Sequence, residues 1–448
     1  MQQTLFGAPA ATNGFRDSSF AKNKTLPLHR WVPWIAGFSA DFVEDCLQKY
    51  LPSDSTTACV LDPFAGVGTT LVEAYLRGLN VVGFEINPYA ALAVKLKLQA
   101  IKISTHDLGR EISRFERFME RAENGGRKGA PHSKPPRGFS GRTELFSPKV
   151  ERKVLYALDF INDIEETTTR DLFRLGFGSV MVSLSNYSYE PSLTRRVAVG
   201  KPPVEDANVG ISLSAKLHLM LEDIGWLQGH MKGTGRKPQA RVYPRSIFTA
   251  PDTFPKGNIA DLVITSPPYL NNYHYPRNTR PQLHWLGFTS GAGYNGAGED
   301  KSFGKFWQTV RGGPAVALDF DLTELFDVIE EVRSRNSGKG QYGGPGWANY
   351  VATYFNDTYR FCKVMAQVLK PNTPAIVVLG NSIIQGVEVK TDYFFGRIGE
   401  MCGLAFEDNL LLRNKRTGNS IIQSSVRVDQ ASAKTVLYES GVVLRKQP

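Results

Sequence analysis

Two short stretches of the sequence combine residue types that could bind a ligand and act on it. The first is the run Asp62-Pro63-Phe64-Ala65-Gly66-Val67-Gly68-Thr69-Thr70, and Glu85 stands 19 residues after Gly66. Glycines let the backbone turn sharply and approach a ligand closely, and a carboxylate at such a distance can accept hydrogen bonds from both hydroxyls of a ribose. The second stretch, Ser266-Pro267-Pro268-Tyr269, offers a hydroxyl, a rigid backbone and an aromatic face.

The glycine run favours a nucleoside ligand that carries no pyrophosphate. A phosphate-binding P-loop needs a lysine before its Ser or Thr, and no lysine is present in this run. A dinucleotide-binding loop would have a third glycine where Leu71 stands. S-adenosylmethionine has a ribose and no phosphate, so it fits better than either. The alternative is an ordinary strand-to-helix turn without a ligand.

Alternating strand and helix patterns surround both stretches. Each stretch directly follows a short apolar run that reads as a buried strand, and helices are predicted from Thr69 to Arg77 and after Asn87-Pro88. This alternation indicates an α/β fold with a doubly wound, mainly parallel sheet. Strands are predicted at 58–64, 80–86, 260–265 and 374–380, with closing antiparallel strands at 405–412 and 435–445.

The strand and helix alternation is interrupted, which predicts one α/β domain in two parts. We expect residues 1–24 to form a flexible arm, 25–100 the first half of the domain, and 240–448 the second half. The intervening residues 101–239 read as a mainly helical insertion. Two glycine-rich stretches in the second half, 287–304 and 334–346, are expected to be mobile loops.

The composition favours a polyanionic partner and gives no sign of a membrane protein. The 448 residues carry a formal net charge of +10 with a pI of about 9.3, which suits nucleic acid. No run of about 18 apolar residues predicts a membrane-spanning helix, and the first residues do not resemble a secretory signal. The four cysteines form no C-x-x-C pair, so neither a metal site nor a disulfide framework is expected, and a reducing cytoplasm is the simplest location.

The two stretches together resemble the DNA amino-methyltransferases. DPFAGVGTT is similar to motif I of that family, GFEINPYA at 83–90 to motif II, and SPPY to its catalytic motif. The segment around Trp31 and Trp34 resembles motif X, with an aromatic packing cluster as the alternative. The resemblance implies a Rossmann-like methyltransferase sheet, S-adenosylmethionine as cofactor, and a bacterial or archaeal protein associated with the nucleoid. It implies that the cofactor is bound by Asp62, Phe64, Ala65, Gly66, Gly68, Thr69, Thr70, Glu85, Asn87 and Trp31.

The residue types of the second stretch suit methylation of an exocyclic amine. Such an amine is a poor nucleophile, because its lone pair is delocalised into the ring of the base. The hydroxyl of Ser266 and the carbonyl of Pro267 could each accept one N–H, and Pro267 and Pro268 would preorganise these acceptors. Tyr269 offers a flat face for a base rotated out of duplex DNA. Ser266, Pro267, Pro268 and Tyr269 are therefore the predicted catalytic residues.

Ser266 at the first position of this motif is typical of enzymes that methylate N4 of cytosine, and we predict that reaction. The alternatives are an N6-adenine DNA methyltransferase, whose motif usually starts with Asp or Asn, an RNA amino-methyltransferase, and a non-catalytic DNA-binding subunit. Double-stranded DNA is the expected partner, and a cognate restriction enzyme is a second candidate partner.

Basic and aromatic residues outside the motifs are predicted to contact nucleic acid. One group follows the catalytic motif and another is in the insertion: Asn272, Tyr273, Tyr275, Arg277 and Arg280, and then Arg195 and Arg196. The sequence departs from the family at motif III, where an acidic residue is common. The corresponding stretch is RVYPRSIF at 241–248, so no cofactor contact is predicted there.

Overall fold

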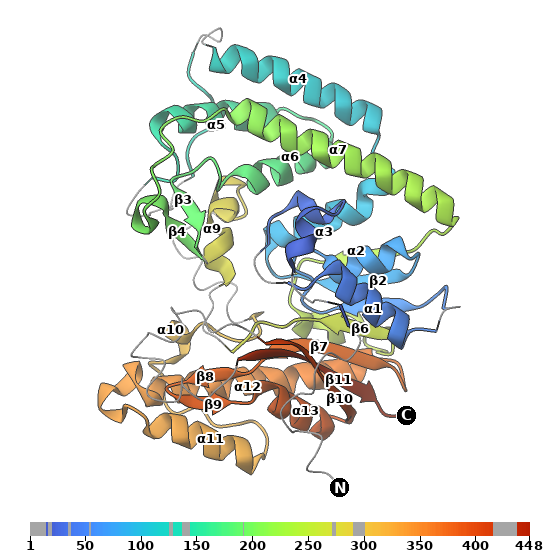
Figure 1. Cartoon of the computed structure of the whole chain (residues 1–448), viewed down its shortest axis with the longest axis vertical. Helices are drawn as coiled ribbons and strands as arrows, with labels where there is room; N and C mark the ends of the chain where they lie inside the picture. The colour runs from blue at the N-terminus through green and yellow to red at the C-terminus, as the bar shows by residue number, and fades with distance from the viewer. Residues whose placement is uncertain are drawn as a thin grey trace.

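A seven-stranded sheet forms the centre of the protein (Figure 1). The computed structural model describes residues 15–16, 20–34, 37–52, 55–124, 129–136, 144–190, 192–270, 275–289, 301–414 and 437–448. The strands lie in the order β10-β11-β7-β6-β1-β2-β5, and β11 is antiparallel to both of its neighbours. Their bounds are β1 Cys59–Asp62, β2 Asn80–Phe84, β5 Ala240–Tyr243, β6 Leu262–Thr265, β7 Pro374–Gly380, β10 Leu404–Asn414 and β11 Tyr438–Lys446. The predicted α/β class with a mainly parallel sheet and an antiparallel closing pair is confirmed.

Successive residues of the strands face opposite sides of the sheet and enter two different cores. In β1, Val60 joins the core that contains helices α1 to α3, and Leu61 joins the core that contains α8 and α11 to α13. The first set of helices is α1 Ala40–Tyr50, α2 Thr69–Leu76 and α3 Pro88–Gln99. The second set is α8 Ala250–Thr253, α11 Thr323–Ser334, α12 Gly344–Val368 and α13 Thr391–Met401. The sheet is therefore covered by helices on both faces, as a doubly wound fold requires.

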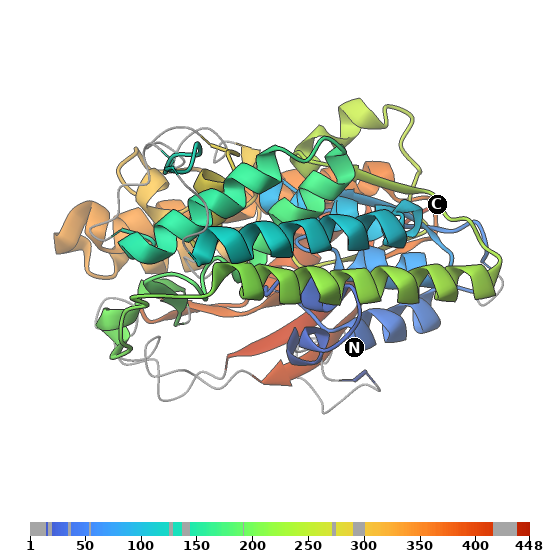
Figure 2. The ribbon, with the colours of Figure 1, turned by 90° about the horizontal axis from the view of Figure 1, so that it is seen from above.

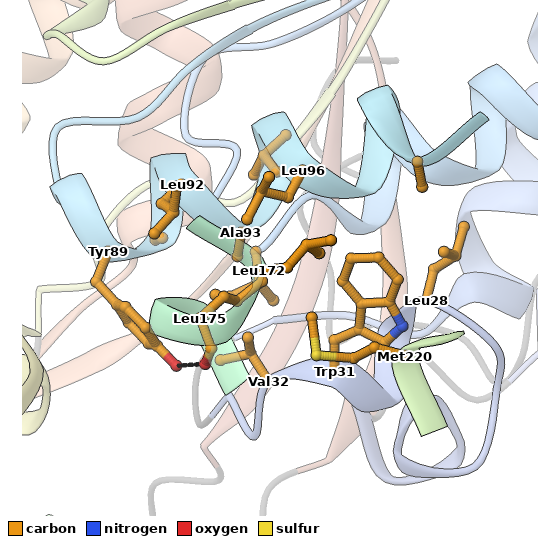
Figure 3. Close-up of a cluster of buried hydrophobic side chains, with 14 of the residues drawn as sticks. Leu28, Trp31, Val32, Tyr89, Leu92, Ala93, Leu96, Leu172, Leu175 and Met220 are labelled. Atoms are coloured by element: carbon orange, nitrogen blue, oxygen red, sulfur yellow. Dashed lines mark hydrogen bonds between the residues drawn. The ribbon is translucent and has the colours of Figure 1, made fainter. Parts of the chain in front are cut away.

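Residues between β2 and β5 add a further layer of helices above the first core, as Figures 1 and 2 show. These elements are α4 Thr105–Glu123, α5 Pro148–Asn162, α6 Thr167–Val180, the hairpin of β3 Tyr187–Tyr189 and β4 Leu193–Arg195, and α7 Val209–Thr234. Leu172 of α6 and Met220 of α7 belong to the same buried cluster as Leu92 and Leu96 of α3 (Figure 3). The added helices thus share one continuous core with α1 to α3.

Polar residues fix where the helices near the motifs begin. Ser39 Oγ accepts a hydrogen bond of 3.1 Å from the backbone N–H of Phe42 at the start of α1. Asn87 Oδ1 accepts bonds of 3.0 and 3.3 Å from the N–H groups of Tyr89 and Ala90, and Pro88 occupies the first turn of α3. Both side chains satisfy N–H groups that have no partner within their helix.

The remaining helices and strands of the described part are mostly short. They are η1 Phe20–Lys24, η2 His29–Trp31, η3 Ala100–Lys102, η4 Arg196–Val199, η5 Ile247–Thr249, α9 Tyr275–Trp285, α10 Trp307–Val310, η7 Ser337–Tyr342, β8 Ser382–Ile384 and β9 Val387–Val389. The stretch 334–346, expected to be a mobile loop, forms η7 and the first turn of α12 instead. Its glycines allow close backbone packing: a Cβ on Gly344 would lie 2.2 Å from the carbonyl oxygen of Arg335. No helix in the described part is long and apolar enough to cross a membrane.

Candidate active site

The glycine run and the catalytic motif meet at the point where the strand order reverses. The strand β1 has β2 on one side and β6 on the other, and all three are parallel. Asp62 ends β1 and Thr265 ends β6, so both motifs begin at the carboxyl edge of the sheet. Ligands of open α/β sheets bind at such a switch point. Two stretches about 200 residues apart are thereby brought to one place.

Hydrogen bonds join the two motifs directly. The hydroxyl of Thr265 donates to Asp62 Oδ1 at 2.7 Å, and the hydroxyl of Thr70 donates to the carbonyl of Ile264 at 3.1 Å. Asp62 is buried, and this burial raises its pKa to about 6 despite the hydrogen bonds that favour its charge. Asp62 and Thr70 therefore hold the residues before Ser266 in place.

Glu85 fixes the shape of the glycine run. Its Oε2 accepts a hydrogen bond from the N–H of Gly66, and its Oε1 accepts one from the N–H of Asn87, both at 2.7 Å. Gly66 and Gly68 have φ angles of +52° and +89°, which favour glycine. Burial raises the pKa of Glu85 to about 7. A carboxylate is thus held rigidly where the carboxyl ends of β1 and β2 meet.

The catalytic motif is held by residues that sequence reasoning did not identify. The hydroxyl of Tyr354 in α12 donates to the carbonyl of Pro268 at 3.1 Å, and Ser382 Oγ donates to the carbonyl of Leu270. The hydroxyl of Tyr269 donates to Glu439 Oε1 at 3.1 Å. Tyr354, Ser382 and Glu439 are far from the motif in sequence, and no local pattern marks them.

Ser266 differs from these neighbours in the hydrogen bonding of its side chain. It is half-buried, and among the described residues nothing forms a hydrogen bond with its hydroxyl. Within the same part of the chain, no hydrogen bond to the carbonyl of Pro267 is present either, whereas the next carbonyl, that of Pro268, is occupied by Tyr354. The hydroxyl and the first proline carbonyl of the motif therefore keep their capacity to accept hydrogen bonds.

Aromatic rings support the glycine run from the second core. The ring of Phe64 packs edge-on against Phe303 at 5.4 Å and lies 5.4 Å from Phe361 of α12. Phe303 also packs edge-on against Tyr354 at 5.3 Å. The ring that precedes the glycines and the tyrosine that holds Pro268 therefore belong to one cluster, which couples the position of the glycine run to that of the catalytic motif.

Comparisons with known proteins agree on the class of protein. A family model described as DNA methylase (N6_N4_Mtase) matches residues 17–95, which include the glycine run and Glu85. The type II methyltransferase M.BsoBI of Geobacillus stearothermophilus is 25% identical over 288 residues, which cover 60% of this chain and 54% of that protein. M.AvaI of Anabaena variabilis is 23% identical over 428 residues, 90% of this chain and 84% of its own.

The family model and the curated relatives support the DNA amino-methyltransferase family for this chain. The match to M.BsoBI spans only about half the length of that relative. Among solved structures, the rRNA methyltransferase AviRa of Streptomyces viridochromogenes aligns over 97% of this chain and 88% of its own, with 9% identity and a TM-score of 0.29. That score is too low to bear on the fold or the function.

The segment that resembles motif X is anchored to the added helices. Trp31 is fully buried, and its indole N–H donates to Asp223 Oδ2 of α7 at 2.9 Å. The N–H of Leu28 donates to the same oxygen at 2.8 Å, and Arg30 forms an ion pair with Asp223. The indole nitrogen of Trp34 lies 3.3 Å from the point that a Cβ on Gly66 would occupy. Trp34, rather than the predicted Trp31, therefore borders the glycine run.

Other predicted cofactor residues contact the protein itself. Asn87 caps α3 and its Nδ2 donates to Thr279 of α9 at 2.7 Å, and Thr69 is buried beside Asn23 at the start of α2. Ala65 donates its N–H to the carbonyl of Phe84 at 2.9 Å, which ties the run to the end of β2. Residues directly at the sheet edge, above all Gly66 and Glu85, are better placed to meet a ligand. Ile86, which sequence reasoning missed, is 38% exposed beside them.

The residues predicted to contact nucleic acid fall in adjacent elements. The β3–β4 hairpin packs on α9, because the hydroxyl of Tyr189 donates to the carbonyl of Asn278 at 3.0 Å. This contact brings Arg195 and Arg196 to the same part of the molecule as Arg277 and Arg280. Arg277 is exposed and Arg280 is half-buried. Of the remaining predicted residues, Tyr275 begins α9, and Asn272 and Tyr273 lie outside the described residues.

Proposed function

We propose that this methyltransferase transfers the methyl group of S-adenosylmethionine to the N4 amino group of a cytosine rotated out of duplex DNA. The observation that carries the proposal is a pair of acceptors, the Ser266 hydroxyl and the Pro267 carbonyl, which receive no hydrogen bond from the described residues and lie beside the glycine run and Glu85. Similarity to DNA methyltransferases supports DNA as the substrate, and the cytosine assignment rests on Ser266.

The residues at the carboxyl ends of β1 and β2 fit the proposed cofactor. Glu85 has each carboxylate oxygen fixed by one backbone N–H, which leaves further lone pairs for two ribose hydroxyls. Gly66 and Gly68 have no side chains, so a ligand can approach their backbone closely. The run 62–70 contains no lysine of the kind that binds phosphate in a P-loop. The exposed side chain of Ile86 would offer an apolar surface to the adenine. When bound, the cofactor supplies an electrophilic methyl group on a sulfonium.

The catalytic motif would orient the amine by accepting its two N–H groups. Ser266 Oγ and the Pro267 carbonyl would each accept one, which directs the nitrogen lone pair toward the methyl group. The bonds from Tyr354 to Pro268 and from Thr265 to Asp62 hold the acceptors on either side. Tyr269 would stack on the flipped base while its hydroxyl stays bound to Glu439.

We further propose that α9, the β3–β4 hairpin and the helices of residues 101–239 recognise the target sequence. Arg277 and Arg280 follow the catalytic motif by about ten residues, and the hairpin with Arg195 and Arg196 packs on the same helix. Phosphate and base contacts from these residues would position the duplex beside Ser266. The type II relatives favour a role as the modification partner of a restriction enzyme.

Nucleoside analysis would test the proposed reaction. The protein and a Ser266→Ala variant would be expressed in a host that lacks DNA methylation, and its genomic DNA would be digested for mass spectrometry. We expect N4-methylcytosine with the unaltered protein and none with the variant. N6-methyladenine would overturn the choice of base and keep the amine chemistry. If neither product is found although the protein binds the cofactor, DNA methylation is contradicted, and RNA methylation or a binding role would be tested next.

A further inference from the structure

A second basic surface lies next to the catalytic motif and is built from segments other than α9 and the β3–β4 hairpin. It is built by residues 301–312, which include α10, and by residues 337–347, which include η7 and the first turn of α12. We call it the Arg311 surface. Figure 1 shows α10 at the left, between α9 above and α11 below.

Stacked rings and a guanidinium form the centre of this surface. The guanidinium of Arg311 lies 4.4 Å from the ring centroids of both Trp307 and Tyr342. Trp307 in turn stacks on Trp347 of α12 at 4.7 Å. Trp347 is buried, whereas Tyr342 is 52% exposed. The two segments are thus joined by cation–π and stacking contacts.

The backbone beneath these rings is packed too closely for side chains. A Cβ on Gly346 would lie 2.0 Å from the carbonyl oxygen of Gln341 and 3.0 Å from Cβ of Arg311. A Cβ on Gly343 would lie 2.1 Å from the carbonyl oxygen of Asn336. The glycines therefore hold η7 against α10, which gives the basic groups a defined position rather than that of a loose loop.

The charge on this surface has one sign. Residues 301–312 and 337–347 include four basic residues, Lys301, Lys305, Arg311 and Lys339, and no aspartate or glutamate. Of these four, Lys305 forms an ion pair with Asp357 at 4.0 Å. In the part of the chain that the structure describes, no ion pair involves Lys301, Arg311 or Lys339. Lys301 and Lys339 are exposed.

Direct contacts connect the Arg311 surface to the catalytic motif. A Cβ on Gly304 would lie 3.3 Å from the ring of Tyr354 and 3.8 Å from Cβ of Pro268. Tyr354 is seven residues after Trp347 on the same helix, so the two are separated by about 10 Å along the axis at 1.5 Å per residue. The Arg311 surface and Tyr354, which holds the Pro268 carbonyl, are therefore joined through α12.

We propose that the Arg311 surface binds phosphates of the duplex next to the flipped base, as a DNA contact separate from α9 and the β3–β4 hairpin. This inference rests on the proposed DNA substrate. Lys301, Lys339 and Arg311 supply charge that forms no ion pair with a carboxylate in the described part, and the Arg311 guanidinium lies over the exposed ring of Tyr342. Phosphate contacts of this kind position the duplex without reading its sequence.

A salt titration of DNA binding would test the proposal. Affinity for a duplex oligonucleotide would be measured by fluorescence anisotropy at several KCl concentrations, for the unaltered protein and for Lys301→Gln/Lys339→Gln. Each lost phosphate contact lowers the slope of log affinity against log salt by about 0.9. We expect a slope reduced by between one and two, at least roughly tenfold weaker binding near 0.15 M salt, and unchanged cofactor affinity by calorimetry.

Two further variants make the result specific. Lys102→Gln/Lys256→Gln removes the same charge from exposed positions outside the Arg311 surface, and it should leave the slope unchanged. Lys301→Arg/Lys339→Arg should restore the slope of the unaltered protein. An unchanged slope in Lys301→Gln/Lys339→Gln, or an equal loss in the control, would overturn the Arg311 surface alone. Failure of the unaltered protein to bind any duplex would instead contradict the proposed function, and the surface with it.

Discussion

The glycine run and the Arg311 surface use glycine in different ways. Gly66 and Gly68 adopt positive φ angles, so the chain can turn over the carboxylate of Glu85. Gly344 and Gly346 have no positive φ, but a Cβ on either would lie within 2.2 Å of a carbonyl oxygen. The first use leaves a recognisable pattern after a strand, and the second leaves only a high glycine content. A glycine-rich stretch can therefore be a tightly packed element as readily as a loop.

Ser266→Ala should have the largest effect, because it removes one of the two acceptors proposed for the amine. We expect kcat to fall by about 10²–10³-fold, the usual cost of one preorganised hydrogen-bond partner in a transition state. Cofactor affinity should stay the same, since Glu85 and the glycine run are unaltered. Single-turnover kinetics and calorimetry would measure the two quantities.

A matched serine gives the control for that variant. Ser212→Ala, at a half-buried position on α7, should leave kcat unchanged. Equal activity of Ser266→Ala and the unaltered enzyme would break the assignment of the catalytic motif.

Gly344→Ala tests the packing role of glycine in the Arg311 surface. The added Cβ would lie 2.2, 2.3 and 2.5 Å from the carbonyl oxygens of Arg335, Val332 and Arg333. We expect a loss of about 3 kcal/mol or more in the free energy of unfolding, since overpacking against backbone cannot relax easily. Urea denaturation would measure it.

The neighbouring Gly338 provides the comparison. A Cβ there meets nothing within 4 Å, and its φ is not positive. Gly338→Ala should be neutral or stabilise the fold by about 0.4–1 kcal/mol, because it reduces the entropy of the unfolded chain. Similar stability of the two variants would show that this stretch is the loose loop that its composition predicts.

Glu85 should make cofactor binding depend on pH. Burial raises its pKa to about 7, and the ionised form accepts hydrogen bonds from hydroxyls better than the protonated form. We expect affinity for S-adenosylmethionine to rise from pH 5 to 7 by up to about tenfold per unit and to level off above. Glu85→Gln should bind about ten- to a hundredfold more weakly, without this dependence.

The stability of the cofactor-free protein should change in the opposite direction. The unfolded chain ionises Glu85 near its ordinary pKa of 4.5, whereas the fold keeps the proton to about 7. This contribution to the free energy of unfolding is complete below pH 4.5 and is lost as the pH rises to 7. Asp62 titrates in the same range, with a pKa of about 6. A pH dependence of cofactor affinity that persists in Glu85→Gln would assign it to Asp62 and contradict the prediction.

The sequence predicted those features that depend on local order along the chain. Strand endings at Asp62 and Thr265 and the helix start at Asn87 follow from apolar runs and neighbouring polar residues. Contacts made across the fold were not predictable in this way. The bonds of Tyr354 to Pro268 and of Trp31 to Asp223 join positions 86 and 192 residues apart, and no local sequence pattern links the two members of either pair.

Substitutions of Tyr269 should have the smallest effect on activity. They separate the contribution of stacking from that of hydrogen bonding in the catalytic motif. Tyr269→Phe loses the bond to Glu439 Oε1 but keeps the ring, and the carboxylate of Glu439 remains paired with Arg413. We expect a loss of about 1 kcal/mol or less, a few-fold in kcat/KM. Tyr269→Ala also removes the stacking face and should cost about 1–3 kcal/mol. Equal losses in the two variants would mean that the hydroxyl matters more than the ring, because the phenyl group would then contribute nothing to holding the base.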